Sequence, residues 1–332
     1  MELIRGHYNL RLRHRGCVAT IGNFDGLHIG HRAILERLIE ISTEMKLPSM
    51  VITFEPHPQE FFNPARRPPR LTSFREKIEV LARVPIDRVL CLHFNRALAE
   101  MSALDFIHKL LVDALGVRCL VVGGDFRFGH RRVGDVPLLR QEGERLGFEV
   151  IVMDAVEIDG RRISSTRIRD ALQRGDLAEA ERLLGRRYRL AGLVVAGDGR
   201  GRQIGFPTAN VHLQRRAYAR GATPHDAPLA GVFAVEVYGV QENALKGVAN
   251  IGVRPTFGGQ PRSVLEVHLL DFDGDLYGRH ILVEFHTRLR DERRFDSPEA
   301  LRQQIAKDVA EARAWFEWSD RPQGGMAATR NT

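Results

Sequence analysis

The chain has 332 residues, which is enough for two domains that each bury a core of their own. Hydrophobic residues make up 43% of the chain and charged residues 27%, a balance typical of globular proteins that excludes a disordered chain. The net charge of +7 suits polyanionic partners, either nucleic acids or phosphorylated small molecules, and composition does not decide between them.

No segment predicts a membrane span or export from the cell. The N-terminal sequence MELIRGHYNLRLRHRG lacks the continuous apolar core of a signal peptide, and no apolar run approaches membrane-spanning length. Cys17, Cys91 and Cys119 lie far apart, are odd in number and form no CxxC pair, which argues against disulfides and thiolate metal sites. We therefore expect a cytoplasmic protein without a membrane partner.

Short apolar runs alternate with amphipathic stretches up to about Leu184. Periodicity predicts buried strands at residues 17–22, 50–54, 88–94, 118–124 and 149–153, and helices at residues 31–45, 74–83, 103–115 and 137–146. Ser73 with Glu76 fits a capping box at one helix start. Two further helices, RIRDALQRG and LAEAERLLG, follow. This alternation predicts a doubly wound, Rossmann-like α/β domain with helices on both faces of a parallel sheet.

The pattern changes near Tyr188. From there to about Arg290, apolar segments alternate with period two and are separated by glycine-rich or polar turns, without helices between them. This pattern predicts an antiparallel barrel or sandwich. A helix is predicted at residues 297–318, with Ser297 as its N-cap and Pro298 at its first position. We therefore expect an α/β domain at residues 1–186 and an all-β domain at residues 187–318.

Two polar segments fall outside these regular elements. Residues 214–229, QRRAYARGATPHDAPL, predict a mobile loop within the second domain. Residues 319–332 predict a disordered tail.

The first predicted strand runs into GNFDGLHIGH (22–31), where a helix begins. Ligands of open parallel sheets sit beyond the carboxyl ends of the strands, and a helix start offers phosphate free N–H groups and positive potential. His28 and His31 lie on one side of that helix start, so both imidazoles can donate hydrogen bonds to an α-phosphate under attack. A lone HxxH is more often a pair of capping histidines, but the whole string after a strand favours nucleotidyl transfer.

Ser164, Ser165, Thr166 and Arg167 stand together at the start of another predicted helix. Three hydroxyls with an arginine can hold the β- and γ-phosphates that leave as pyrophosphate. Simple N-capping explains one of these hydroxyls, but not the whole group.

The segment GGDFRFGHRRVGD (123–135) follows the fourth predicted strand. Its glycines, aromatic residues and arginines are typical of a binding loop at the carboxyl end of a strand. A tight turn with buried Phe126 and Phe128 explains the same residues equally well.

The all-β domain carries a second group of motifs. The chain has no GxxxxGK[ST], which excludes a Walker-type kinase. Instead GDGRGR (197–202) precedes GFPTAN (205–210), and its glycines can wrap phosphates with backbone N–H groups. Thr208 and Asn210 point the same way in an extended segment, where their oxygens can complete a Mg²⁺ shell of water and phosphate. An exposed glycine-rich turn explains these residues alone more simply.

Glu266 stands within the apolar run VLEVHLLDF (264–272). Alternation places Glu266 and His268 on one face of the predicted strand, opposite its apolar side chains. An acidic side chain in such a strand either faces solvent or has a functional role, and periodicity does not decide between these two interpretations. In the functional interpretation Glu266 is a general base that takes a proton from a substrate hydroxyl.

These motifs together resemble a known family. GNFDGLHIGH, TFEPHP, GGDFRFGHRRVGD and ISSTRIR resemble, in order and spacing, the FMN adenylyltransferase half of the prokaryotic bifunctional riboflavin kinase/FAD synthetase family. GDGRGRQIGFPTAN, GVFAVEV, GVANIGVRPTFGG, LEVHLLDF and RLRDERRFDSPEALRQQI resemble its riboflavin kinase module, a six-stranded β-barrel. Segment 214–229 is longer than the usual connection, and Phe233 replaces a tyrosine common in the family.

The resemblance implies phosphorylation of riboflavin to FMN and adenylylation of FMN to FAD, both with ATP and Mg²⁺. It implies that His28 and His31 act in adenylyl transfer and that Glu266 is the base for the riboflavin 5′-hydroxyl. The expected ATP contacts of the adenylyltransferase are Gly22, Phe24, Asp25, Gly30, Ser164, Ser165, Thr166 and Arg167. The expected FMN contacts are Asp125, Phe126, Arg127 and Phe128. For the kinase, the expected contacts are Gly197, Gly199, Gly201, Gly205 and Pro207 with ATP, and Thr208 and Asn210 with Mg²⁺.

Three alternatives explain less of the chain. Another HxGH adenylyltransferase, acting on pantetheine phosphate or nicotinamide mononucleotide, leaves the all-β domain unexplained. Class I aminoacyl-tRNA synthetases share the HIGH signature, but they need a Lys-rich signature and an RNA-binding domain that this sequence lacks. A nucleic-acid-binding protein needs interleaved surface aromatics, and aromatic residues are 7% of this chain, so we expect no nucleic-acid partner.

Overall fold

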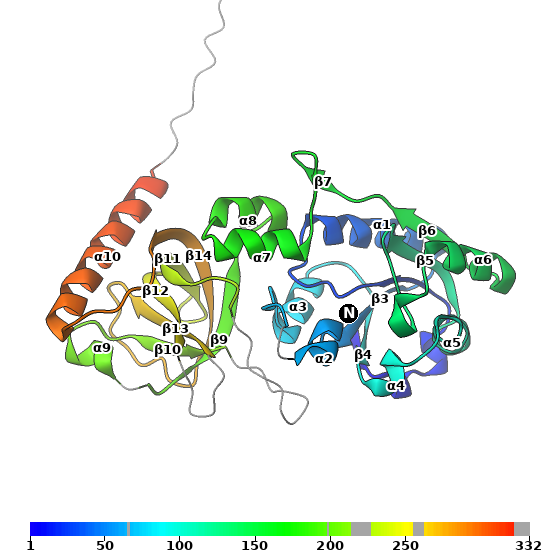
Figure 1. Ribbon diagram of the computed structural model, residues 1–332, viewed down its shortest axis with the longest axis horizontal. Coiled ribbons are helices and arrows are strands. Elements are labelled where there is room, and N and C mark those ends of the chain that lie inside the picture. Colours follow the sequence, from blue (N-terminus) through cyan, green and yellow to red (C-terminus); the bar gives the residue numbers. More distant parts are fainter. Residues whose placement is uncertain (65–66, 198, 214–226, 255–261, 322–332) are drawn as a thin grey trace, which may run out of the picture. The chain divides into compact units, whose positions relative to one another are not determined.

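A computed structural model describes residues 1–64, 67–197, 199–213, 227–254 and 262–321 (Figure 1). Backbone contacts divide the chain into two compact units, with a break between Arg186 and Arg187. Most of the predicted loop at 214–229 and of the predicted tail lies outside the described residues. Among the helices that are described, none has both the length and the hydropathy of a membrane span.

The first unit is built on a six-stranded sheet of order β1-β4-β3-β2-β5-β6, in which all the described pairs are parallel. Its strands are β1 (Glu2–Arg5), β2 (Cys17–Ile21), β3 (Ser49–Glu55), β4 (Arg88–His93), β5 (Val117–Gly123) and β6 (Glu149–Met153). The five strands predicted from β2 onward are confirmed, whereas the short β1 was missed. The strand order reverses between β2 and β5, so the loops leaving these two strands flank the switch point where such sheets bind ligands.

Helices cover both faces of this sheet, which confirms the doubly wound prediction. On one face, Val18, Val51 and Val121 of the strands pack with Leu35 and Leu38 of helix α1. On the other face, a second cluster joins the alternate strand residues to the described helices after β4 and β5. The main helices are α1 (Ile29–Met45), α3 (Phe74–Leu81), α5 (Ala103–Asp105), η4 (Phe106–Ala114), α6 (Val136–Leu146), α7 (Ser165–Gln173) and α8 (Leu177–Leu184).

Shorter elements complete the unit. They are the helical turns η1 (His7–Asn9), η2 (Leu12–His14), α2 (Pro58–Phe62), α4 (Arg96–Ala99) and η5 (His130–Arg132), and the hairpin of β7 (Glu157–Ile158) and β8 (Arg161–Arg162). The segment predicted as one α-helix at 103–115 differs from expectation, because Phe106–Ala114 is a π-helix. Hydrophobic spacing over two turns does not distinguish the two helix types. The Ser73 capping box is confirmed, with Ser73 Oγ accepting the Glu76 N–H at 3.0 Å.

The second unit is a closed six-stranded barrel of order β10-β13-β12-β11-β14-β9, and its described pairs are antiparallel. Its strands are β9 (Arg189–Val195), β10 (Ala209–His212), β11 (Gly231–Tyr238), β12 (Leu245–Arg254), β13 (Arg262–Leu269) and β14 (His280–Arg290). The barrel is thus the correct one of the two predicted β architectures. A short helix, α9 (Arg200–Gln203), was not expected within the glycine run.

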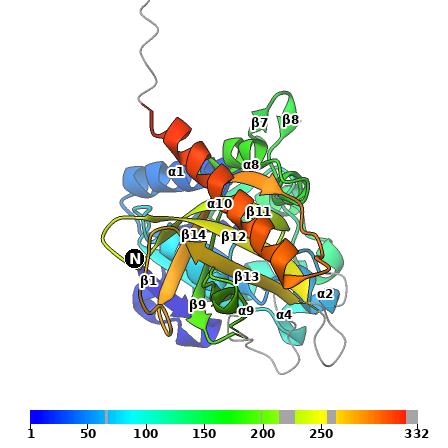
Figure 2. The same ribbon diagram turned by 90° about the vertical axis from the view of Figure 1, so that its left-hand side faces the viewer.

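Helix α10 (Pro298–Ser319) lies across the outer surface of the barrel (Figure 2). Its Ala312 and Phe316 pack on Val232, Ala234 and Val248 of the strands. Ser297 caps it by accepting the Ala300 N–H at 3.1 Å, as predicted. The tail prediction began one residue early, because the helix includes Ser319; the following Asp320 forms an ion pair with Lys246.

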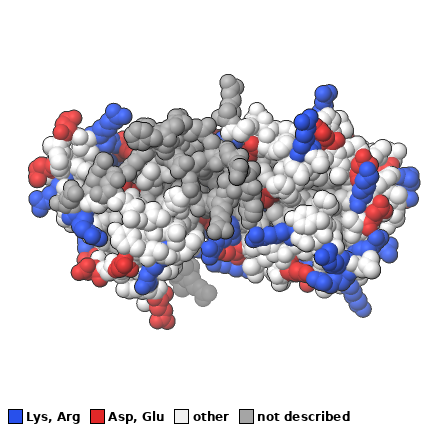
Figure 3. Space-filling model, turned by 90° about the horizontal axis from the view of Figure 1, so that it is seen from below, with Lys and Arg blue, Asp and Glu red and all other residues white. Residues whose placement is uncertain are grey.

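The surface charge is mixed in the view of Figure 3, where Lys and Arg side chains alternate with Asp and Glu. On the described part of that face, the net charge of +7 therefore does not form one continuous basic surface.

Candidate active sites

His28 and His31 meet at the start of α1, on the loop that leaves β2. His28 is the N-cap of the helix, and its Nδ1 accepts the backbone N–H of His31 at 3.3 Å. The two imidazole rings stack with centroids 3.6 Å apart and planes at 15°. Gly30 allows this arrangement, because a Cβ there would lie 3.3 Å from the His28 ring. The two predicted catalytic histidines thus lie side by side at the switch point of the sheet.

Burial keeps both imidazoles neutral. It lowers the pKa of His28 to about 4 and holds the pKa of His31 well below its usual value. Because His28 Nδ1 accepts a hydrogen bond, the neutral ring carries its proton on Nε2, which is a donor. His31 Nδ1 is buried without a hydrogen-bond partner in the described part of the chain. A ligand that hydrogen-bonds these nitrogens would satisfy a polar group that is otherwise costly to bury.

The neutrality of His28 can be tested directly in the full-length protein. We expect its ring to titrate near pH 4 rather than about 6.5, because the buried imidazole resists charging. Histidine NMR of the ring protons, recorded from neutral pH downwards, measures the midpoint, and His28→Asn assigns the resonance. The exposed His93 is the internal control. A midpoint at or above the ordinary value would contradict a neutral donor.

Asp25 holds the loop in place from within. Its side chain is buried and accepts hydrogen bonds from the backbone N–H groups of Leu71 at 3.1 Å and Thr72 at 3.0 Å. It also forms an ion pair with Arg169 of α7. Burial alone would raise the pKa of Asp25, but the Arg169 guanidinium and the Thr72 hydrogen bond outweigh it, so the pKa is lowered. The carboxylate oxygens are occupied within the protein, and the ATP contact of Asp25 stays a prediction.

Three other groups fix the same loop. Buried Lys77 donates to the Asn23 carbonyl at 2.7 Å, and Ser165 Oγ donates to the Asp25 carbonyl at 2.9 Å. The Arg186 guanidinium donates to the Gly26 carbonyl at 2.6 Å and to the Leu27 carbonyl. Leu27 and Phe24 have positive φ angles of 42° and 49°, a conformation that costs non-glycine residues about 1–2 kcal/mol. Both side chains are buried, and this burial offsets the cost.

Replacing Asp25 by Asn is expected to destabilise the first unit by about 3–5 kcal/mol, because it leaves Arg169 buried without its counter-charge. Since the folded pKa is depressed, this stabilisation is present above the unfolded pKa of about 3.9 and is lost as the pH falls below it. Urea unfolding of the Asp25→Asn variant at pH 7 measures the loss. Asp170→Asn, on an exposed site of α7, is the control, and equal stability of the two variants would refute the structural role.

The hydroxyl cluster at the start of α7 also has internal partners. Ser164 caps the helix by accepting the Arg167 N–H at 3.2 Å. The Arg167 guanidinium pairs with Glu179 and donates to the Arg161 carbonyl at 2.9 Å. Thr166 is exposed. The sequence showed the donors of this cluster but not their partners within the protein. Because Arg167 is paired with Glu179, a contact of Arg167 with pyrophosphate would require this ion pair to open.

The predicted FMN loop is split between core and surface. Phe128 is buried in the core, and Phe126 stacks on it with centroids 5.5 Å apart. The burial of Phe128 favours the tight-turn interpretation, and its FMN contact stays a prediction. Exposed Asp125 pairs with Arg162 of β8 at 2.7 Å, and exposed Arg127 pairs with Asp135 at 3.1 Å.

Phe24 and Gly22 have structural positions as well. The Phe24 side chain is almost fully buried, and its ring lies 5.2 Å from that of His31. A Cβ at Gly22 would lie 3.0 Å from the Phe24 ring, so the glycine admits this packing. Sequence reasoning missed Arg162, whose positive charge helps to lower the pKa of both imidazoles. Its signal was the Arg161-Arg162 pair immediately before the hydroxyl cluster.

In the barrel unit, the strand register brings the predicted kinase residues together. Asn210 of β10 is the direct partner of Glu266 on β13, and Glu266 is in turn the partner of Asn250 on β12. Side chains directly opposite each other in an antiparallel pair have Cβ atoms about 4.5–5.5 Å apart. The neighbours Leu265 and Val211 are buried, so the row of Asn210, Glu266 and Asn250 faces the opposite side. Sequence reasoning did not identify Asn250.

The glycine run lies directly against this row. A Cβ on Gly197 would overlap the Asn210 amide, and a Cβ on Gly201 would come within 2.9 Å of Thr208 Oγ1. His268 Nδ1 donates to the Pro207 carbonyl at 2.8 Å and so ties the Thr208 segment to β13. The hydroxyl, amide and carboxylate oxygens gathered here are the donor set that Mg²⁺ prefers. Thr208, Asn210 and Glu266 therefore fit the Mg²⁺-nucleotide predicted for this site. The other predicted ATP contacts, Gly199, Gly205 and Pro207, are exposed.

Comparison with known proteins decides between the alternatives. Residues 10–167 match the family model described as FAD synthetase, and residues 184–316 match the model described as riboflavin kinase. A bifunctional riboflavin kinase/FMN adenylyltransferase of Pseudomonas fluorescens is 52% identical over 95% of this chain and 97% of its own. The protein of the same name from Escherichia coli K12 is 50% identical over 95% of this chain and 98% of its own. The chain belongs to the bifunctional riboflavin kinase/FMN adenylyltransferase family.

The chain is also similar to a solved structure. A crystal structure described as a macrolide-efflux protein of Streptococcus pneumoniae has a TM-score of 0.77 and 30% sequence identity. The match covers 95% of this chain and all of the other. The two family models and the full-length relatives confirm the family resemblance inferred from the sequence motifs along nearly the whole chain.

Proposed function

We propose that the α/β unit adenylylates FMN to FAD and that the barrel unit phosphorylates riboflavin to FMN, with ATP as the co-substrate of both. The observation that carries the first assignment is the stacked pair of neutral imidazoles at the α1 N-terminus. The adjacency of Glu266 and Asn210 beside the glycine run supports the second. Riboflavin, FMN, FAD and ATP are then the small-molecule partners of the chain.

In adenylyl transfer, a phosphate oxygen of FMN attacks the α-phosphate of ATP, and pyrophosphate leaves. No proton has to be removed from this nucleophile, because the phosphate is already an anion at neutral pH. What the protein supplies is alignment and charge stabilisation. His28 Nε2 donates a hydrogen bond to the α-phosphate, the buried His31 imidazole lies beside it, and the N-terminus of α1 adds its positive potential.

In riboflavin phosphorylation, the nucleophile is a neutral hydroxyl, so a base is needed. The Glu266 carboxylate takes the proton of the riboflavin 5′-hydroxyl while the hydroxyl oxygen attacks the γ-phosphate of ATP. The Gly197 and Gly201 backbones, which lie against Asn210 and Thr208, would face the phosphates, and Thr208 and Asn210 would hold the nucleotide with its Mg²⁺. Bound Mg²⁺ supplies charge neutralisation to the phosphates.

We also place the enzyme in the cytoplasm. Cys17, Cys91 and Cys119 are free and buried, and burial raises the pKa of Cys17 and of Cys91 to about 12. Three inert, unpaired thiols suit a reducing compartment.

The assignment of one reaction to each unit is tested with two fragments. A fragment of residues 1–186 is expected to convert supplied FMN to FAD without phosphorylating riboflavin, and residues 187–332 are expected to do the reverse. Products are separated by chromatography after incubation with ATP and Mg²⁺, with circular dichroism to show that each fragment folds. Riboflavin phosphorylation by a folded 1–186 fragment would overturn the assignment.

A further inference from the structure

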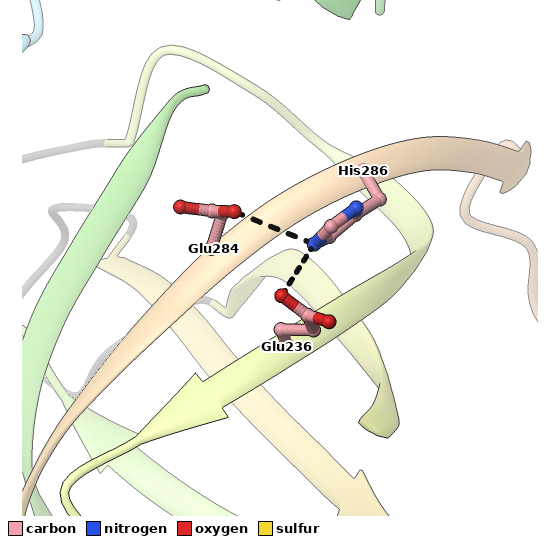
Figure 4. Close-up of side chains that lie close together, drawn as sticks. All are labelled: Glu236, Glu284 and His286. Atoms are coloured by element: carbon pink, nitrogen blue, oxygen red, sulfur yellow. Dashed lines mark ion pairs between the residues drawn. The ribbon is translucent and has the colours of Figure 1, made fainter. Parts of the chain in front are cut away.

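A second polar cluster lies in the barrel unit, on strands that carry none of the predicted kinase residues. Glu236 of β11 and Glu284 of β14 are direct register partners. The pairing of the two strands shifts between Ala234 and Val235, which leaves His286 as an extra residue of β14. Such bulges re-aim a side chain. Figure 4 shows the result: the His286 ring points its Nε2 between the two carboxylates.

The three side chains are largely removed from solvent. The side chains of His286, Glu284 and Glu236 are 3%, 5% and 25% exposed. Trp315 and Phe316 of α10 cover the ring, with centroids 5.2 and 5.6 Å from that of His286. Neither ring nitrogen of His286 makes a hydrogen bond among the described residues. A buried imidazole without hydrogen bonds is costly, and the Nε2 of this ring lies at ion-pair distance from both carboxylates.

The spacing of the ligand atoms matches the coordination shell of a tetrahedral cation. His286 Nε2 lies 3.3 Å from Glu236 Oε2 and 3.5 Å from Glu284 Oε1, and the three atoms lie within 4.8 Å of one another. Bonds of about 2.1 Å at tetrahedral angles place neighbouring ligand atoms about 3.4 Å apart, as in three-residue zinc sites with water as the fourth ligand. One nitrogen and two carboxylate oxygens favour zinc over Mg²⁺, which prefers oxygen alone.

We propose that Glu236, Glu284 and His286 form a binding site for a zinc-type divalent cation. Neighbouring side chains already orient the ligands as such sites require. Arg189 holds the other oxygen of Glu284, Oε2, and Tyr238 donates to Glu236 Oε2 at 3.0 Å. Arg187 lies 3.6 Å from Glu284 Oε1 and is 40% exposed, so it is the group that the cation displaces. The bound cation joins β11 to β14 under α10 and has a structural role.

Binding is tested on the full-length protein after treatment with a chelator and its removal. Zn²⁺ is titrated against a competing chromogenic chelator in excess Mg²⁺, which occupies the oxygen-only sites. We expect one tight equivalent in the wild type and an affinity at least about 100-fold weaker in Glu236→Gln and His286→Gln. The controls are Glu242→Gln and His280→Gln, exposed residues of the same unit, which should retain the tight equivalent. No tight equivalent, or one that survives both ligand substitutions, would overturn the proposal.

Trp315 provides a second readout that locates the ion. The chain has two tryptophans, and Trp318 is 65% exposed whereas Trp315 contacts the His286 ring. In a Trp318→Phe background, one equivalent of Cu²⁺, a paramagnetic quencher, is expected to quench most of the Trp315 fluorescence, and excess Zn²⁺ should restore it. Glu236→Gln, whose side chain is the most exposed of the three, should abolish this quenching while its far-ultraviolet spectrum stays native. Quenching that persists in this folded variant would place the ion elsewhere and refute the site.

Discussion

Replacing Glu266 by Gln is expected to reduce FMN formation from riboflavin by roughly 10²–10⁴-fold, the range for loss of a general base. Glutamine keeps the shape of the side chain and one acceptor oxygen but does not take up a proton at neutral pH. Its neighbours Asn210 and Asn250 remain, so nucleotide binding should change little. The measurement is steady-state riboflavin phosphorylation by the full-length chain, with KM for ATP determined alongside kcat.

The same preparation supplies the control for this prediction. Conversion of supplied FMN to FAD should stay near the wild-type rate, because that reaction uses the other unit and a nucleophile that is already charged. Glu242→Gln, at an exposed site of the barrel unit, should leave both rates unchanged. Near-normal riboflavin phosphorylation by Glu266→Gln would show that the carboxylate lies on the solvent-exposed face of the strand and is not the general base.

Loss of either imidazole at the α1 N-terminus is expected to slow FAD formation from FMN by roughly 10²–10³-fold, the scale for removing one transition-state donor. The structure shows which substitutions isolate that effect. His28 is also the N-cap of α1, so His28→Ala would remove a cap worth about 1 kcal/mol as well as the donor. His28→Asn retains a capping side chain and removes the ring, and His31→Ala leaves the cap in place.

Both variants should phosphorylate riboflavin at the wild-type rate, which shows that the chain is folded and the barrel unit intact. We expect kcat of FAD formation to fall more than KM for FMN rises, since the donors act mainly on charge that develops during the reaction. If His28→Asn retained full adenylyl transfer, the ring would be a cap and not a catalytic donor. Equal loss of both reactions in either variant would indicate misfolding.

Sequence patterns predicted the sheet, its covering helices and the barrel because the spacing of apolar residues indicates which side chains are buried. Uninterrupted apolar runs such as residues 17–22 predicted strands buried on both faces, and β2 is fully buried. Ala209–His212, which forms β10, shows no such run, and the sequence predicted only an extended segment there. Within the site, His28 and His31 could be placed together because both belong to one helix start, where spacing alone determines which side chains meet.

Contacts between distant segments were beyond the reach of these patterns. Asp25 reads as a polar loop residue, and only the fold shows that Arg169 and Thr72 occupy its oxygens. The adjacency of Asn210 and Glu266 depends on a strand register that no local pattern encodes. Sequence reasoning therefore identified residues able to bind or react, but it did not separate those that face a ligand from those that support the loop.

The loop after β2 also has a consequence for how the enzyme is made. Its supports come late in the chain: Asp25 and its partner Arg169 are separated by 144 residues, and Gly26 and Arg186 by 160. A nascent chain on the ribosome that has completed β2 and α1 still lacks every group of α7 and the segment after α8 that shapes the loop. Closing so long a loop costs entropy that these late contacts help to offset. Translation must therefore pass Arg186 before the loop after β2 has all of its supporting contacts.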